Sequence, residues 1–216
     1  MKHILIILNI IVYSIVIFAC TSLEKRDDKI NIKKGDVILV IEEKYIKQNI
    51  SNLIAKAYNL KTGKIYKPDS NHQTYVDMIY FGSELYGIDY KDIIAVITIE
   101  SGWNPLAYNY NNNTLKSEDY GIAQINTQHL DGNYKVAKKI CDKYKIKYTN
   151  SIYDIRLNIL SAFIYLDDTR TELKSLNAFE NERWIKSYNV GVRGSIAYKI
   201  KADKYYSKFI NIRSNL

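Results

Sequence analysis

The chain has 216 residues, enough for one domain with a sizeable hydrophobic core. Its 47% apolar and 25% charged residues are typical of a globular protein, which excludes a disordered or low-complexity chain. The formal net charge of +8 favours anionic partners such as cell-wall polymers or lipid headgroups. The lysines are scattered, and no arginine-rich run or nucleic-acid-binding motif is present, so we expect no nucleic acid partner.

The N-terminus predicts export. Residues 1–20 read "MKHILIILNIIVYSIVIFAC", in which a short basic start precedes an apolar run, as in a secretory signal peptide. The run is short for a membrane-spanning helix, which needs roughly 20 apolar residues. Cys20 follows the small residue Ala19, which resembles the lipobox of bacterial lipoproteins, although Phe18 departs from that pattern. We therefore expect lipidation of Cys20 on the periplasmic face of a bacterial membrane. An ordinary signal peptide and an uncleaved anchor are the alternatives.

Residues 21–68 are expected to form a tether and an uncharacterised N-terminal segment. The polar residues 21–35 read as the tether, "DVILVI" at 36–41 as a strand, and "KYIKQNISNLIAKAYNL" as a helix. If Cys20 is lipidated, Cys141 has no partner in the chain, because the sequence contains only two cysteines. Cys141 is then expected to be a small buried hydrophobe.

From residue 69 to 216 the pattern predicts one mainly α (α+β) domain. "NHQTYVDMIYFGSELYG" has helical spacing and ends at Gly87. Asp89 is placed to cap a second helix, which is apolar on nearly every face between Ile93 and Ile99 and ends before Pro105. The Tyr- and Asn-rich stretch that follows predicts a small β-hairpin or a long loop. Further helices are expected over 133–147, 153–173, 182–189 and 197–212.

Glu100 ends the apolar run "DIIAVITIE". A glutamate near a helix end is usually solvated, but here the flanking helix is apolar, so the carboxyl is expected to emerge from the core into a cleft. Partial burial disfavours the charged form and raises the pKa of a carboxyl. A carboxyl with a raised pKa can donate a proton near neutral pH, which is the chemistry that cleavage of a glycosidic bond requires.

Four blocks occur in order across about residues 75–210: "ESGWNP", "YGIAQIN", "NILSAFIYL" and "SYNVGVRG". Together they resemble the lysozyme-like lytic transglycosylases, a bacterial family with a Glu-Ser pair, a Gly-x-x-Gln-Ile block and a Tyr-Asn-x-Gly motif. "DYGIAQIN" is most similar to the compact transglycosylases associated with type IV secretion. The resemblance implies a lysozyme-like fold with a small β-hairpin or loop beside the cleft.

The resemblance also implies a reaction. Glu100 would be the sole acid/base, protonating the glycosidic oxygen between N-acetylmuramic acid and N-acetylglucosamine. It would then accept a proton from the muramic acid C6 hydroxyl, which attacks C1 to give a 1,6-anhydro sugar. Ser101 would support Glu100 or the helix end, and Gln124 would contact sugar or acetamido groups. Tyr188 would hydrogen-bond near Glu100 and orient it, and Asn189 would shape the same wall.

Asp119 leaves a second mechanism open. "ES" followed by "DYGIAQIN" also resembles animal-type lysozymes, in which a glutamate is the acid and an aspartate the nucleophile or stabiliser. We favour the transglycosylase because "SYNVGVRG" follows the bacterial enzymes and because two cysteines cannot make the several disulfides of animal-type lysozymes. For Asp119, a role in the cleft and a structural role in the hairpin both stay open.

The expected partners are the glycan strands of peptidoglycan, the membrane through the lipid anchor, and an envelope-spanning secretion or flagellar machine recruited by residues 36–68. A monomer without cofactor is expected, and no Cys, His, Asp or Glu cluster has the spacing of a metal site. Trp103 could stack on a sugar, although core or rim packing is the more usual role of such a residue. A non-catalytic cell-wall-binding assembly lipoprotein is the alternative from another class.

Overall fold

A computed structural model describes residues 34–112, 116–197 and 199–216 of the protein. The expected signal peptide and the lipidation site Cys20 lie outside the described residues. Residues Glu43–Leu216 form one compact unit. Residues 43–68, which the sequence places before the domain expected from residue 69, belong to this unit. No helix in the described part of the chain is long and apolar enough to cross a membrane.

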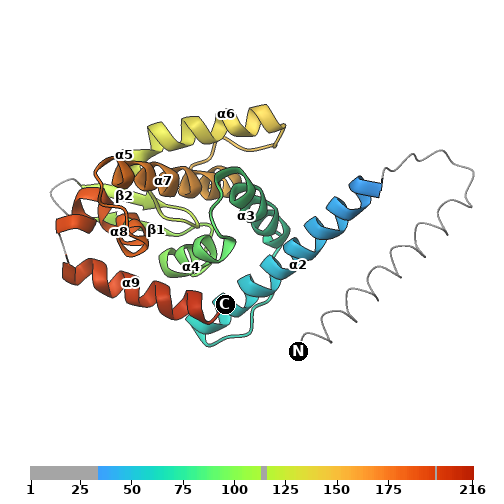
Figure 1. The fold of residues 1–216 in the computed structure, drawn as a ribbon, viewed down its shortest axis with the longest axis horizontal. Helices are drawn as coiled ribbons and strands as arrows, with labels where there is room; N and C mark the ends of the chain where they lie inside the picture. Colours follow the sequence, from blue (N-terminus) through green and yellow to red (C-terminus); the bar gives the residue numbers. More distant parts are fainter. Residues whose placement is uncertain (1–33, 113–115, 198) are drawn as a thin grey trace, which may run out of the picture. The chain divides into compact units, whose positions relative to one another are not determined.

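The fold is mainly helical, with one small sheet, as the sequence predicted (Figure 1). The elements in chain order are α2 (Lys34–Thr62), α3 (His72–Tyr86), α4 (Tyr90–Glu100), β1 (Tyr108–Asn111), β2 (Ser117–Tyr120), β3 (Ile125–Asn126), α5 (Thr127–His129), the π-helix η1 (Leu130–Tyr134), α6 (Lys135–Tyr144), α7 (Ile155–Ser175), α8 (Asn181–Ala197) and α9 (Lys199–Ser214).

The strand expected over residues 36–41 is wrong, because these residues lie in helix α2. Later in α2, Ile50, Ile54 and Ala57 are fully buried. Their spacing places them on one side of the helix, which packs on the domain core. Residues 50–57 of the N-terminal segment therefore contribute to the hydrophobic core of the domain.

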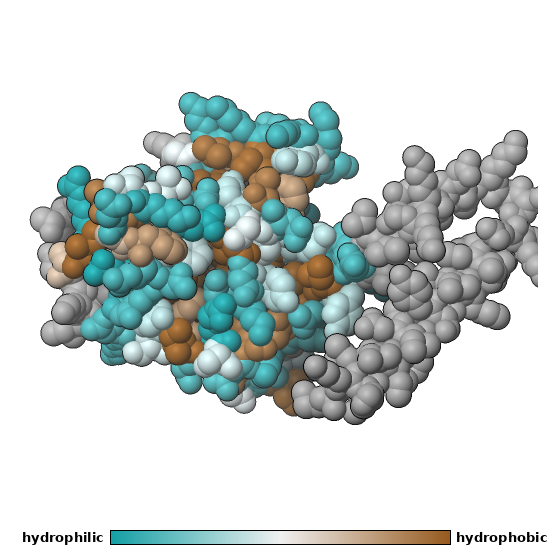
Figure 2. All heavy atoms as spheres, in the orientation of Figure 1, coloured by the Kyte–Doolittle hydropathy of each residue, from teal (hydrophilic) through white to brown (hydrophobic). Residues whose placement is uncertain are grey.

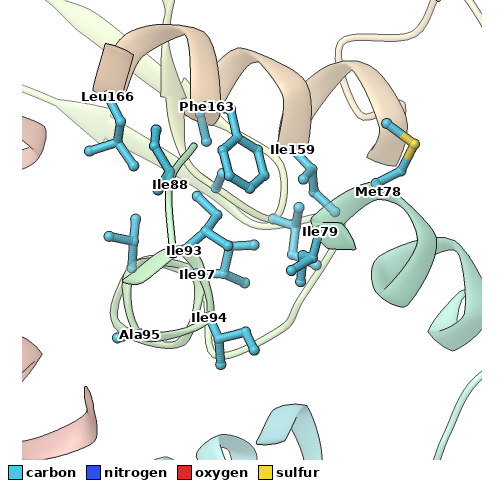
Figure 3. Close-up of a cluster of buried hydrophobic side chains, with 14 of the residues drawn as sticks. Met78, Ile79, Ile88, Ile93, Ile94, Ala95, Ile97, Ile159, Phe163 and Leu166 are labelled. Carbon is cyan, nitrogen blue, oxygen red and sulfur yellow. The ribbon is translucent and has the colours of Figure 1, made fainter. Parts of the chain in front are cut away.

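Helix α4 lies at the centre of the core because almost every side chain along it is apolar. Ile93, Ile94 and Ile97 are fully buried, and Figure 3 shows Ile93 and Ile97 on the side of α4 that faces Phe163 of α7. The helix begins as predicted, with the Asp89 carboxylate accepting the Lys91 backbone N–H at 2.9 Å. Helix α4 ends at Glu100, whose carboxyl is thus delivered to the edge of the core.

Helix α7 packs against α3, α6 and α8, and α9 packs against α4 and α8 (Figure 1). A Cβ added to Gly82 of α3 would collide with the Phe163 ring, so glycine permits the close approach of α3 and α7. Figure 2 shows hydrophilic residues along the outer edge of α6 and hydrophobic residues beneath them. This agrees with the burial of Ala137 and Cys141, the latter as expected from the sequence.

The predicted β-hairpin is confirmed and has a third short strand. Strands β1 and β2 pair antiparallel, with Asn109 opposite Asp119, and β2 pairs antiparallel with β3, with Asp119 opposite Asn126. Asp119 therefore lies in the middle strand with an asparagine on each side. The sheet positions this carboxylate at a fixed place in the fold.

Candidate active site

A cleft of about 1570 Å³ is lined by the sheet, by the end of α4 and by residues 188–191 of α8. It brings together all the site residues that the sequence singled out, namely Glu100, Ser101, Asp119, Gln124, Tyr188 and Asn189. These residues come from four separate parts of the chain, and only the tertiary fold places them around one cavity. The cleft is therefore the candidate active site.

Glu100 is the most perturbed carboxyl in the cleft. Burial raises its pKa to about 7 from an ordinary value of 4.5. The Tyr205 hydroxyl donates a hydrogen bond of 2.7 Å to Glu100 Oε1 and opposes this rise. The negative charge of Asp119 adds to it, whereas Lys61 and Lys208 oppose it. The carboxyl is thus partly protonated near neutral pH, as an acid/base needs to be.

Tyr205 is a site residue that the sequence analysis missed. It lies in α9, 105 positions after Glu100, and its side chain is buried. Tyr205, Phe209 and Ile212 recur at helical spacing and are all buried, so the sequence could have placed Tyr205 on the inner face of α9. Nothing in the sequence pairs it with Glu100, because the chain has 20 tyrosines.

Tyr188 has a different contact from the one expected. Its hydroxyl donates to the backbone oxygen of Ala123 at 2.8 Å, and the hydrogen bond to Glu100 comes from Tyr205 instead. Burial and the nearby Glu100 charge raise the Tyr188 pKa far above its usual value, so it stays protonated as a donor. Its ring meets the Tyr165 ring edge-on at 5.5 Å. Tyr188 thereby ties α8 to the turn before Gln124.

Ser101 and Trp103 serve the end of α4. The Ser101 hydroxyl donates to the Ile97 carbonyl at 3.4 Å and accepts the Trp103 backbone N–H at 3.1 Å. Ser101 therefore supports the helix end rather than the Glu100 carboxylate. The Trp103 indole donates to Thr98 Oγ1 at 3.0 Å, and its side chain is only 5% exposed. Trp103 is a core residue and does not line the cleft.

Asp119 is enclosed by three asparagine amides. Asn126 donates to its Oδ1 at 2.6 Å, and Asn109 and Asn111 donate to its Oδ2 at 3.1 and 2.7 Å. These bonds hold the carboxylate in a fixed orientation. Asp119 lines the cleft, and its charge acts on Glu100. It therefore takes part in both the cleft and the hairpin, the two settings that the sequence left open.

Asn158, from the "NILSAFIYL" block, fixes the turn that carries Gln124. Its Oδ1 accepts the Ala123 N–H at 2.7 Å, and its Nδ2 donates to the Tyr120 carbonyl at 2.8 Å and to the Tyr134 hydroxyl at 3.1 Å. Gly121 has φ +77°, and an added Cβ there would lie 2.5 Å from Asn158 Nδ2. The motif glycine is thus required by both backbone conformation and space.

Gln124 itself turns back toward this glycine. Its Nε2 donates to the Gly121 carbonyl at 3.0 Å, and its backbone has an unusual positive φ of 52°. Few non-glycine residues adopt this conformation, and those that do are concentrated at functional sites. The turn presents Gln124 to the same cleft as Glu100.

A mainly helical domain with a small sheet, and a half-buried glutamate in the cleft beside it, defines the lysozyme-like class of fold. The profile of the Transglycosylase SLT domain family matches residues 77–211, and the chain belongs to this family. It is 29% identical over 139 residues to the membrane-bound lytic murein transglycosylase C of Edwardsiella ictaluri (strain 93-146). That match covers 63% of this chain and 36% of the relative, so the chain spans about a third of the relative's length. No solved structure matches the chain.

Proposed function

We propose that the protein is a peptidoglycan lytic transglycosylase that cleaves the β-1,4 bond between N-acetylmuramic acid and N-acetylglucosamine. The observation that carries this proposal is the Glu100 carboxyl, which lies in the cleft with a pKa raised to about 7. Family membership and the printed name of the relative support the same substrate. The test is release of soluble fragments from purified peptidoglycan by the full chain. Failure to release any would contradict the proposal.

Glu100 performs both proton transfers in the proposed mechanism. The hydrogen bond from Tyr205 occupies Oε1, which leaves Oε2 to carry the proton to the glycosidic oxygen. The bond from C1 to the glycosidic oxygen breaks. The Glu100 carboxylate then accepts the proton of the C6 hydroxyl while the oxygen of that hydroxyl bonds to C1. The product is a 1,6-anhydro sugar, no water is consumed, and Glu100 returns to its starting protonation state.

Asp119 acts as an electrostatic stabiliser in this mechanism. A retaining hydrolase would need it as a nucleophile about 5–5.5 Å from the acid. Both of its oxygens already accept amide hydrogen bonds, so attack on the sugar would disturb a bonded network. This arrangement favours the transglycosylase over the muramidase that uses Glu100 and Asp119 together.

Substitution of Tyr205 and Asp119 tests these assignments through the pH profile. Because Glu100 donates its proton first, kcat/KM should fall as the pH rises through about 7. Tyr205→Phe removes a bond that lowers the Glu100 pKa, so this alkaline limb should move to higher pH, with about a 10–100-fold loss of rate. Asp119→Asn removes a charge that raises this pKa, so the limb should move to lower pH.

The two variants serve as controls for each other. Damage to the fold would lower kcat/KM in both, but it would not shift the alkaline limb of the pH profile in opposite directions. Under the proposed mechanism Asp119 is secondary, so Asp119→Asn should retain turnover within about tenfold, below the about 10²–10³-fold loss that removal of a principal stabilising group causes. A loss of that larger size would contradict the secondary role of Asp119.

We propose that Cys20 carries the lipid anchor and that the domain works at the periplasmic face of a bacterial membrane. The lipobox-like end of residues 1–20 supports this, and the name of the relative includes "membrane-bound". The type IV secretion-associated subtype and recruitment to an envelope machine stay predictions. In cells fed a labelled fatty acid, the full chain should incorporate label and Cys20→Ser should not. Equal labelling of both would rule out Cys20 as the acylated residue.

A further inference from the structure

A second cavity of about 650 Å³ lies beside the loop that joins α2 to α3. It is lined by residues of that loop together with Tyr58, Tyr75 and Trp103. It shares no lining residue with the catalytic cleft. Its volume is within the range of about 300–1,000 Å³ that is usual for small-ligand sites. All of its lining residues except Trp103 precede residue 77, where the family match begins.

The loop that forms this second pocket is held in one conformation. The Tyr66 N–H donates to Asn59 Oδ1 at 2.7 Å, and the Lys64 N–H donates to Thr62 Oγ1 at 3.1 Å. The Tyr66 hydroxyl lies 2.8 Å from His72 Nδ1, and its ring meets the Tyr58 ring edge-on at 5.3 Å. A pocket anchored in this way loses little conformational freedom on binding, which favours affinity.

The side chains around the second pocket favour an anion with an apolar part. Lys64 and Lys67 are exposed at it, and neither forms an ion pair with any residue that the structure describes. The Asp69 carboxylate also lines the pocket, but it accepts the Tyr75 hydroxyl at 3.2 Å and the Asn71 N–H at 2.9 Å. The exposed Ile65 and the half-buried Tyr58 and Tyr66 offer apolar contact. A short peptide with free carboxylates has both properties.

The second pocket lies within reach of a ligand bound in the catalytic cleft. Glu100 lines the cleft and Trp103 lines the pocket, and their Cα atoms are at most about 11 Å apart because consecutive Cα atoms are about 3.8 Å apart. The Lys61 amine donates to the Ile99 carbonyl at 3.5 Å, so a third cation lies over the end of α4. An extended peptide of about four residues spans about 13–14 Å, enough to connect the two sites.

We propose that this second pocket binds the peptide stem of the peptidoglycan substrate, with the stem carboxylates at Lys64 and Lys67. The proposal rests on the proposed function, because that function supplies a glycan that carries peptides. It gives the segment before the family domain a role in substrate selection. The enzyme would then prefer glycan strands that bear peptides over strands from which the peptides have been removed.

The first test compares two substrates with the full chain: peptide-bearing glycan strands and the same strands stripped of peptide by an amidase. Lys64→Ala with Lys67→Ala should lower kcat/KM for the peptide-bearing strands by about 3–10-fold, the range of two exposed ion pairs, and leave the stripped strands unchanged. Lys135→Ala with Lys139→Ala, which removes equal charge from exposed positions on α6, should change neither value. Equal losses on both substrates, or no loss on either, would overturn the proposal.

The second test does not depend on catalysis. A free tetrapeptide of stem composition is titrated into the full chain and followed by NMR, and saturable shifts that the Lys64→Ala, Lys67→Ala pair abolishes are expected. An N-acetylglucosamine tetrasaccharide serves as the uncharged comparison. If the pocket instead binds the sugar and ignores the peptide, the proposal is wrong. Inactivity on both kinds of strand together with peptide binding would count against the proposed function and leave peptide recognition standing.

Discussion

Glu100→Gln is expected to reduce kcat by about 10²–10⁴-fold, the usual contribution of a general acid/base. The loss should lie toward the upper end of that range, because one residue performs both proton transfers. Glutamine keeps an acceptor for the Tyr205 hydroxyl, so the substitution removes the titratable group and little else. Turnover of purified peptidoglycan measures the effect. Glu84→Gln, on an exposed position of α3, is the matched control and should have wild-type activity.

The same variant should be more stable than the wild type at alkaline pH. The folded-state pKa of Glu100, about 7, lies above the value of 4.5 for an unfolded glutamate. The stability contributed by the protonated carboxyl is therefore fully present below about pH 4.5 and is lost as the pH rises through 7. At pH 8 the gain from Glu100→Gln should be about 1–3 kcal/mol, measured by chemical denaturation. A variant that is less stable than the wild type at pH 8 would contradict the assigned burial of the carboxyl.

Asn158→Leu is expected to lower the free energy of unfolding by about 3–5 kcal/mol. Asn158 is fully buried and makes three hydrogen bonds, two of them to the backbone of the turn that carries Gln124. Leucine has a similar volume but leaves the Ala123 N–H and the Tyr120 carbonyl without this partner. The site should loosen as well, so KM should rise together with the loss of stability.

Ser161→Ala, one turn further along α7, is the control for this prediction. Ser161 is as completely buried as Asn158, but its hydroxyl has no hydrogen-bond partner among the described residues. Its removal should leave stability unchanged or raise it. Urea denaturation of the two variants compares a bonded with an unbonded buried polar group on one helix. Equal destabilisation by both would show that the Asn158 hydrogen bonds do not hold the turn.

The parts of the fold that the sequence predicted are those with a local cause. Asp89 precedes the apolar helix that it caps, and an Asn cluster separates the two arms of the hairpin, so both features could be predicted from short stretches. Glu100 could be placed at a cleft because its own helix is apolar on nearly every side. The five apolar residues at 37–41 suit a strand or a helix equally, and in the structure they belong to the longer helix α2.

The contacts that the sequence could not predict join residues that are far apart in the chain. Tyr205 reaches Glu100 only because α9 packs against α4. The three amides around Asp119 depend on the register of β1, β2 and β3, in which a shift by one residue would turn their side chains to the other face. Apart from Trp103, the second pocket is lined by residues that precede the four motif blocks, where the sequence carried no resemblance.

The most direct test of the central claim is the mass of the muropeptides that the full chain releases from purified peptidoglycan, with Glu100→Gln as the control. If Glu100 alone transfers both protons, the products are one water lighter than reducing muropeptides and are absent with the variant. Products with reducing ends would show that water resolves the reaction. Asp119 would then be the second carboxylate of a muramidase, and the transglycosylase mechanism would be wrong.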